Sequence, residues 1–460
     1  MKRPLVAALS GILFLFTTLG IAAQAAGATA APAAVPAQSA DSLAAYSKAS
    51  PACLAVLAKA QALRNAGKWR AAFDTLATFD PNNKDPFALA METRLCIDGF
   101  IQSEQFQSFT LIDLATGQTL DAARESGSDA PSLPFDPPTL AAALVKTGIS
   151  LPPVLSKVLG DYYYSAQIEY SGNWIMSDDD AYAKALENYQ AAYAGGVFDA
   201  DSLQNLAELL MRTNRTAEAA PIFQKSIDLN PGSPTARYNY AICLLRQGDR
   251  TGALDQLDKA LALFTDPQPQ FDTLSLAART AADAGDPARS EAYLKRADAL
   301  SPDAPNAGVL RHEIAVEHGN PAGANAAADA LMPKYASNPG VVRALISTWY
   351  SNGDPASARA FLERSIGATS DDKSIGTLQF YLAILLVQGT PSDADMKTAL
   401  STIDAAVAHM EKVMDPSDQF FAIAQQLRDH ISPPATPEAT PQASPPTQAS
   451  SPAAPAPTTP

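Results

Sequence analysis

The chain has 460 residues, too many for one compact core, so we expect several domains or an extended repeat array. Hydrophobic residues make up 47% of the chain, which supports folding, and its abundant alanine favours packed helices. The formal net charge of −15 argues against non-specific binding to nucleic acid or anionic lipid, but it does not identify a partner.

The first 25 residues have the three parts of a secretory leader. Lys2 and Arg3 are basic, residues 5–21 are mostly apolar, and residues 23–25 (Ala-Gln-Ala) supply a small-x-small cleavage pattern. We therefore expect residues 1–25 to be a cleaved signal peptide, with an uncleaved membrane anchor as the alternative. The chain would then be exported, to the periplasm if the cell has an outer membrane and otherwise outside the cell. We expect no membrane span in the mature chain.

The next segments are expected to form a linker and then a helical region. Residues 26–50 begin with an Ala/Pro/Gln/Ser-rich stretch that predicts a flexible linker, and residues 51–150 are mainly helical in pattern. Gly67, Ala72 and Pro81 mark a partial copy of the repeat described below. Residues 106–120 include a β-branched and aromatic run, so a short β-hairpin there and an irregular helix both stay open.

Three cysteines lie beyond the leader. Cys53 and Cys96 both fall in the N-terminal helical region and could form a disulfide in an oxidising compartment, which the sequence does not decide. Cys243 is flanked by apolar residues and is interpreted as a small buried hydrophobe. Because the chain has no CxxC motif or Cys/His cluster, we expect no metal and no cofactor.

A repeat is evident when the chain is aligned on its turns. The spacings between successive turn residues are 34, 37, 34 and 34 residues. The turn residues are Asn214, Gly248, Gly285, Gly319 and Gly353. Glycine permits the left-handed conformation that ends one helix, and an Asp or Asn directly after it can cap the next. Such caps follow four of the turns, at Asp249, Asp286, Asn320 and Asp354.

The residues around each turn follow a second pattern. Five residues after it lies a small residue, and four further on a larger apolar one, so both share a helix face. The small set is Ala219, Ala253, Ser290, Ala324 and Ala358, and the second set is Phe223, Leu257, Leu294, Ala328 and Leu362. Seven residues before the turn, Ala207, Ala241 and Ala278 are small, whereas His312 and Ile346 are not. Pro231, Pro302 and Pro339 are expected to end helices.

This pattern resembles the tetratricopeptide repeat, a 34-residue helix–turn–helix unit with small residues at its eighth and twentieth positions. The resemblance implies an all-α, right-handed superhelical solenoid. By this resemblance, residues 200–370 contain five repeat units. A degenerate repeat with an insertion precedes them at residues 151–199, and a degenerate repeat with capping helices follows at residues 371–431. We expect residues 432–460, rich in Pro, Ala, Ser and Thr, to form a disordered tail.

The resemblance also implies where a partner would bind. In this family the first helix of each unit lines a concave groove. The residues at the corresponding positions are Gln204, Glu208, Arg212, Tyr238, Arg246, Arg279, Glu313, Arg343 and Tyr350. The Lys/Asn/Arg set by which one branch of the family clamps a C-terminal carboxylate is absent, so that function is not transferred.

The densest aromatic cluster lies between residues 162 and 193. It comprises Tyr162, Tyr163, Tyr164, Tyr170, Trp174, Tyr182, Tyr189 and Tyr193. Repeat packing is one interpretation; a stacking platform for a peptide or glycan is the other. His312 and His318 lie six residues apart on one expected helix and would point about 120° away from each other, so they cannot share a metal there.

The sequence therefore predicts a binding protein and no enzyme. The first hypothesis is an exported scaffold or adaptor that binds a protein partner on its concave face, in cell-envelope assembly or secretion. The alternative is a glycan- or peptidoglycan-associated module that uses the aromatic cluster. No catalytic motif supports an enzyme.

Overall fold

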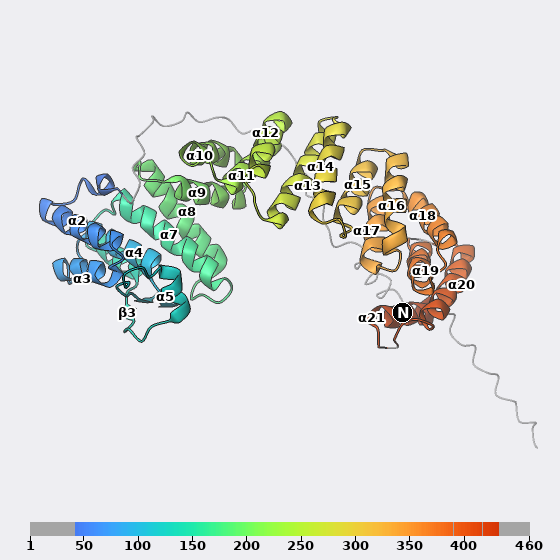
Figure 1. Ribbon diagram of the computed structural model, residues 1–460, viewed down its shortest axis with the longest axis horizontal. Helices are drawn as coiled ribbons and strands as arrows, with labels where there is room; N and C mark the ends of the chain where they lie inside the picture. Colours follow the sequence, from blue (N-terminus) through green and yellow to red (C-terminus); the bar gives the residue numbers. More distant parts are fainter. Residues whose placement is uncertain (1–41, 390, 416, 432–460) are drawn as a thin grey trace, which may run out of the picture. The chain divides into compact units, whose positions relative to one another are not determined.

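The structure is a computed structural model that describes residues 42–389, 391–415 and 417–431 (Figure 1). The predicted signal peptide, the predicted tail and most of the predicted linker lie outside the described residues. The described chain divides at residue 307 into two compact units. The first unit covers residues 42–307 and the second residues 308–431.

The N-terminal part of the first unit combines helices with a small antiparallel sheet of order β1-β2-β3. The helices are η1 (Leu43–Tyr46, a 3-10 helix), α2 (Pro51–Asn65), α3 (Trp69–Phe79), α4 (Pro86–Gly99), α5 (Leu120–Ser126) and α6 (Pro137–Lys146). The strands are β1 (Gln102–Glu104), β2 (Ser108–Thr110) and β3 (Leu133–Pro134).

The hairpin left open for residues 106–120 lies earlier, at residues 102–110. Its turn is formed by Gln105 and Phe106, whose φ angles are +52° and +55°. The Phe106 ring is buried against Phe109 and Tyr162, at 5.5 and 5.7 Å between ring centroids, which accounts for the unusual backbone there. Gly117, at φ +81°, turns the chain just before α5 instead.

The rest of the first unit is a row of helical hairpins. Its helices are α7 (Pro153–Tyr170), α8 (Asp178–Ala194), α9 (Ala200–Arg212), α10 (Thr216–Leu229), α11 (Pro234–Arg246), α12 (Arg250–Leu261), α13 (Pro267–Asp283) and α14 (Pro287–Leu300). Each odd-numbered helix packs on the even-numbered helix that follows it, and each hairpin packs on the next.

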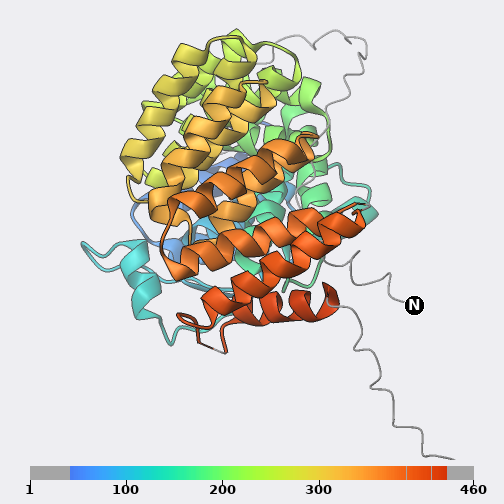
Figure 2. The same ribbon diagram turned by 90° about the vertical axis from the view of Figure 1, so that its right-hand side faces the viewer.

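The second unit has the same construction (Figure 2). Its helices are α15 (Asn306–Glu317, which begins at the boundary), α16 (Pro321–Tyr335), α17 (Pro339–Ser351), α18 (Pro355–Ala368), α19 (Asp372–Val387), α20 (Asp393–Met410) and α21 (Gln419–Ile431). The hairpin of α19 and α20 is the most extensively packed pair in this unit. Among the described residues of the chain, no helix is both long and apolar enough to cross a bilayer.

The turn positions inferred from the repeat are confirmed. All five turn residues have positive φ, from +59° at Asn214 to +86° at Gly248. The side chains of the four capping residues accept hydrogen bonds from the backbone N–H three residues on, at 2.8–3.0 Å. Local sequence chemistry therefore sets where each hairpin turns.

The small-residue positions are buried as expected. Ala219, Ala253, Ala324 and Ala358 are 0% exposed. His312 and Ile346 are equally buried although the pattern asks for a small residue at their positions. An expected solenoid of helical hairpins, all-α apart from the small sheet, is thereby confirmed.

One proline expectation is wrong. Pro231 and Pro302 do follow the ends of α10 and α14, but Pro339 does not end α16, which already stops at Tyr335. Pro339 is the first residue of α17, with the Asn338 side chain capping that helix. Proline is well suited to the first helical position because its missing N–H would be unpaired there anyway.

Candidate partner-binding surface

Polar side chains on the first helices of three successive hairpins, α7, α9 and α11, bond to one another. The Tyr164 hydroxyl donates to one Glu208 carboxylate oxygen (2.9 Å), and the amides of Gln204 and Asn239 donate to the other (3.1 and 3.0 Å). The Ser233 hydroxyl, at the N-cap of α11, donates to the Gln204 carbonyl oxygen (2.9 Å). These five residues are called the polar ladder below.

The polar ladder holds a carboxylate in one orientation. Hydrogen bonds to a charged acceptor contribute about 1.5–3 kcal/mol each, and Glu208 accepts three at a half-buried position. Burial, and then the charge of Glu208, raise the pKa of the Tyr164 hydroxyl, so it stays protonated and donates. Side chains fixed in this way lose little conformational entropy when a partner binds.

Two exposed arginines lie on the same helices as the ladder. The Arg212 guanidinium stacks on the Tyr182 ring, 4.1 Å from its centroid, one helical turn after Glu208. Arg246 donates to the Thr216 hydroxyl (2.9 Å) near the end of α11. Arg212 and Arg246 are 34 residues apart, the repeat length, so they occupy equivalent positions on α9 and α11.

The other residues assigned by repeat position also lie on first helices. Tyr238 on α11 and Arg279 on α13 are half-buried, and burial raises the pKa of Tyr238. In the second unit, Glu313 on α15 and Tyr350 on α17 are half-buried and Arg343 on α17 is exposed. The structure thus brings two of the nine assigned residues into direct contact, in the polar ladder, and the binding role of all nine stays a prediction.

Tyr164, Ser233 and Asn239 belong to the ladder but were not assigned from sequence. A signal for one of them was available. Asn239 lies two residues before the small residue Ala241, as Asn205 lies two before Ala207. If the repeat alignment had included the asparagine positions as well as the apolar ones, it would have identified Asn205 and Asn239 as equivalent residues. Tyr164 was instead counted in the aromatic cluster.

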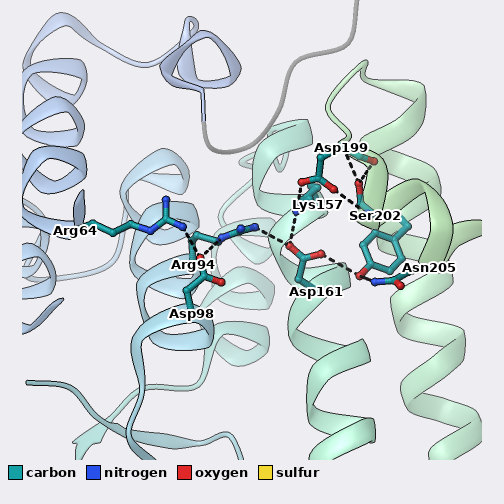
Figure 3. A network of polar contacts seen from close by, with 9 residues as sticks. Arg64, Arg94, Asp98, Lys157, Asp161, Asp199, Ser202 and Asn205 are labelled. Atoms are coloured by element: carbon teal, nitrogen blue, oxygen red, sulfur yellow. Dashed lines mark hydrogen bonds and ion pairs between the residues drawn. The ribbon is translucent and has the colours of Figure 1, made fainter. Parts of the chain in front are cut away.

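A second polar network joins the N-terminal helices of the first unit to the repeats (Figure 3). Arg64 on α2 and Arg94 on α4 both pair with Asp98, at 2.7 and 2.5 Å. Arg94 also reaches Asp161 on α7, at 3.2 Å. These side chains are largely shielded from water, between 15% and 23% exposed, so their pairing is screened less than at a surface.

Lys157 is the most deeply buried member of this ion network. Its ammonium lies 2.8 Å from both Asp161 and Asp199, and its side chain is 3% exposed. Burial would lower the pKa of Lys157, but the two carboxylates outweigh burial and raise it, so Lys157 stays charged. The Tyr189 hydroxyl donates to Asp161 (3.0 Å) and accepts from Asn205 on α9 (3.2 Å). Because its groups pair with one another, we assign the network to holding α4, α7, α8 and α9 together.

The aromatic cluster mainly packs the interior. Tyr162 and Tyr189 are 1% and 2% exposed. Tyr162, Tyr170 and Trp174 donate to backbone carbonyls of the β1–β2 hairpin, at 2.6, 2.9 and 2.7 Å. For the buried rings Tyr162, Tyr163 and Tyr189 the structure favours packing, because a ring already covered on both faces cannot stack on a sugar or peptide. The other five rings of the cluster are half-buried.

His312 is buried, with its ring nitrogens 3.1 Å from the carbonyl oxygens of Ala324 and Leu345. Its ring centre lies 4.2 Å from that of Trp349. Burial lowers the pKa of His312, and the two carbonyls act in the opposite direction. Across the part of the chain that the structure describes, no group of three or more His, Cys, Asp or Glu side chains could hold a metal ion.

The three cysteines are buried and free, so no disulfide joins Cys53 to Cys96. Burial raises the pKa of the Cys53 thiol to about 12, with a further contribution from Asp85, and that of Cys243 to about 11. Thiols with such pKa values are protonated near neutral pH and are poor nucleophiles.

Stacked hairpins with polar first-helix faces define a helical-repeat scaffold. Two tetratricopeptide-repeat family models match residues 179–234 and residues 210–278, from α8 to α13. Residues 179–278 therefore consist of tetratricopeptide repeats, a motif of proteins that bind protein partners.

Several solved structures match parts of the chain at low sequence identity. One is YrrB, described as a TPR protein with an unusual peptide-binding site (19% identity, 42% of this chain and 95% of that chain, TM-score 0.28). Another is a tetratricopeptide repeat protein from Parabacteroides merdae, with 14% identity over 59% of this chain and 98% of that chain and a TM-score of 0.35. A third is PilW, described as a widely conserved type IV pilus biogenesis factor, with 16% identity over 49% of this chain and 98% of that chain and a TM-score of 0.28. No curated protein matches the chain.

Proposed function

We propose that this protein is an exported scaffold that binds an extended segment of a protein partner along its first helices. The observation that carries the proposal is the polar ladder, which links α7, α9 and α11 through Glu208. Three successive repeats thereby present polar groups in fixed positions, as a surface that reads several residues of a partner at once would require.

The chemistry of this surface favours a partner segment with polar and acidic side chains. Arg212 and Arg246 are exposed, one on each of α9 and α11, and can form bidentate pairs with carboxylates. Glu208 already accepts three hydrogen bonds from its neighbours. Its carboxylate therefore holds these side chains in position and is less available to bind a cationic side chain of the partner.

The proposed place of action is the cell envelope, in assembly or secretion. It rests on the leader-like residues 1–25, with their basic start, apolar stretch and small-x-small pattern. We propose the periplasm where the cell has an outer membrane. Mass spectrometry of the protein purified from the envelope fraction tests this directly: a mature chain lacking about 25 residues is expected, and a full-length chain in the cytoplasm would contradict export.

Site-specific photo-crosslinking in living cells tests the binding surface. A photoreactive phenylalanine analogue at Tyr238, on the first helix α11, is expected to crosslink one discrete protein partner. The matched control carries the analogue at Asp255, an exposed residue of the second helix α12. Crosslinking from position 255 but not from position 238 would place the partner on the opposite face and overturn the proposal.

A further inference from the structure

A groove of about 700 Å³ lies in the second unit, away from the first-helix surface. It is formed by the C-terminal ends of two second helices, α16 and α18, and by the start of α19. Its volume falls within the range of sites that hold small ligands or short peptides. Below it is called the C-terminal groove.

The wall formed by α16 has an interrupted backbone. Pro333 lies inside this helix and has no N–H, so the Asp329 carbonyl four residues earlier lacks its usual helical donor. Both residues line the groove. The Asp329 side chain pairs with Arg364 of α18 (3.4 Å), which also donates to Asn325 (2.9 Å), so the two walls are tied together.

The wall formed by α18 has an open end. In α10, α12, α14 and α16, a backbone N–H just beyond the helix bonds to a carbonyl of the last turn, at 2.8–3.3 Å. Among the described residues, no group beyond α18 bonds to the carbonyls of its last turn, residues 365–368. The end of α18 therefore presents hydrogen-bond acceptors to the groove.

A serine side chain adds a third feature. Ser365 lines the groove, is only 6% exposed as a residue, and forms no side-chain hydrogen bond with any described residue. Its hydroxyl is therefore available to a molecule that enters the groove. The groove volume, the open carbonyls and this hydroxyl together describe a polar surface that a ligand can reach.

We propose that the C-terminal groove binds an extended peptide segment of a partner protein, as a second site separate from the polar ladder. Open carbonyls on α16 and α18 accept from peptide N–H groups, and the Ser365 hydroxyl donates to a peptide carbonyl. An extended backbone alternates these donors and acceptors, and it leaves the partner's side chains free to vary. The groove is lined by two acidic and two basic side chains, so its net charge is close to zero. These are Asp329, Asp371, Lys334 and Arg364. We therefore expect the groove to recognise the peptide backbone and not the charge of the partner's side chains.

Selection from a displayed library of random linear dodecapeptides tests the proposal on the full-length chain. The library is first depleted on Ser370→Trp, which places a large ring in the exposed groove-lining loop between α18 and α19. Peptides then enriched on the unmodified protein are expected to bind Ser370→Trp at least about tenfold more weakly. They should also slow amide hydrogen exchange in residues 329–337 and 365–374.

Two further variants keep the test decisive. Ala360→Trp is the matched control: Ala360 is an exposed residue of α18 that lies outside both the groove lining and the last turn, so affinity should be unchanged. Pro333→Ala restores a helical donor to the Asp329 carbonyl and should weaken binding severalfold without lowering the melting temperature. A library that yields no enriched peptide, or peptides that bind Ser370→Trp as tightly as the unmodified protein, would overturn the proposal.

Discussion

The two units build the same hairpins around different interiors. The first unit buries a cation, Lys157, between carboxylates that link several helices, and it keeps alanine at the close-contact positions Ala207 and Ala241. The second unit buries a lone imidazole, His312, between two backbone carbonyls, at a position where the repeat asks for a small residue. The comparison shows that the repeat register sets the turns, whereas each unit fills its interior independently.

The difference has a consequence for where binding features arise. In the first unit, polar groups are paired both inside the ion network and along the polar ladder. In the second, α16 and α18 leave backbone carbonyls open around a groove. Close pairing gives a preorganised surface, whereas an uncapped helix end leaves carbonyls that can accept hydrogen bonds from water or from a partner.

Removing the buried cation should have the largest effect. Lys157→Met leaves Asp161 and Asp199 without their shared partner, which should lower the free energy of unfolding of the first unit by about 3–5 kcal/mol. The control is Lys184→Met, which breaks a surface pair with Glu187 and should change stability by less than about 1 kcal/mol. Urea midpoints followed by circular dichroism measure both. Equal midpoints for the two variants would refute the structural role of the ion network.

Overpacking a close-contact position should come next. Ala219→Trp or Ala253→Trp forces a large ring into a site that is 0% exposed, at a cost of about 1–3 kcal/mol or more. Thermal unfolding measures the effect. An exposed alanine of α10, Ala217, provides the control, because its substitution by Trp meets solvent. A melting temperature of Ala219→Trp equal to that of the control would show that the helices do not approach closely there.

A buried carboxyl group should make the first unit less stable as pH rises. Burial, and then the charges of Asp80 and Asp85, raise the pKa of Glu92 to about 8 from its ordinary value of 4.5. The folded state therefore holds a proton that the unfolded state releases, and stability falls by up to about 1.4 kcal/mol per pH unit between about pH 4.5 and 8. Urea midpoints of Glu92→Gln should depend less on pH across this window; a slope identical to that of the unmodified chain would argue against a neutral Glu92.

The buried imidazole should make the stability of the second unit depend on pH in the opposite direction. Burial lowers the pKa of His312, so the unfolded state binds a proton more readily and stability falls as pH drops below about 6.5. Hydrogen exchange of residues 306–351, compared between pH 7.5 and 5.5 after correction for the intrinsic exchange rate, should show increased opening at the lower pH. His318→Gln, at an exposed site, should behave like the unmodified chain. Stronger protection at pH 5.5 would mean that both carbonyls bind a protonated ring.

Much of the fold could be predicted because it depends on local chemistry. Turn residues such as Gly248 and caps such as Asp249 act within a few positions of the chain, so their spacing alone locates the hairpins. The β1–β2 hairpin was misplaced because its turn is held by distant side chains, including Tyr162 and Trp174, which local pattern does not reveal.

The candidate site was less accessible to sequence reasoning. Repeat position located Gln204 and Glu208, but their partners Tyr164 and Asn239 come from neighbouring repeats, 44 and 31 residues from Glu208. The C-terminal groove could not be foreseen, because it depends on a helix end that is left uncapped in three dimensions. The amide pattern could have located Asn239, but neither the contact of Tyr164 with Glu208 nor the uncapped end of α18 follows from a pattern of spacings.

The central claim is that a protein partner binds along the first helices, and loss of their arginines tests it most directly. The partner identified by crosslinking is captured from envelope extract with the triple variant Arg246→Ala, Arg279→Ala and Arg343→Ala. A control with the same loss of charge on second helices carries Arg250→Ala, Lys295→Ala and Arg359→Ala. Capture should fall at least about tenfold in the first variant alone, while stability changes by only about 0.5 kcal/mol in either, since these substitutions lie outside the core. Full capture by the first-helix variant, or an equal loss in the control, would contradict the account.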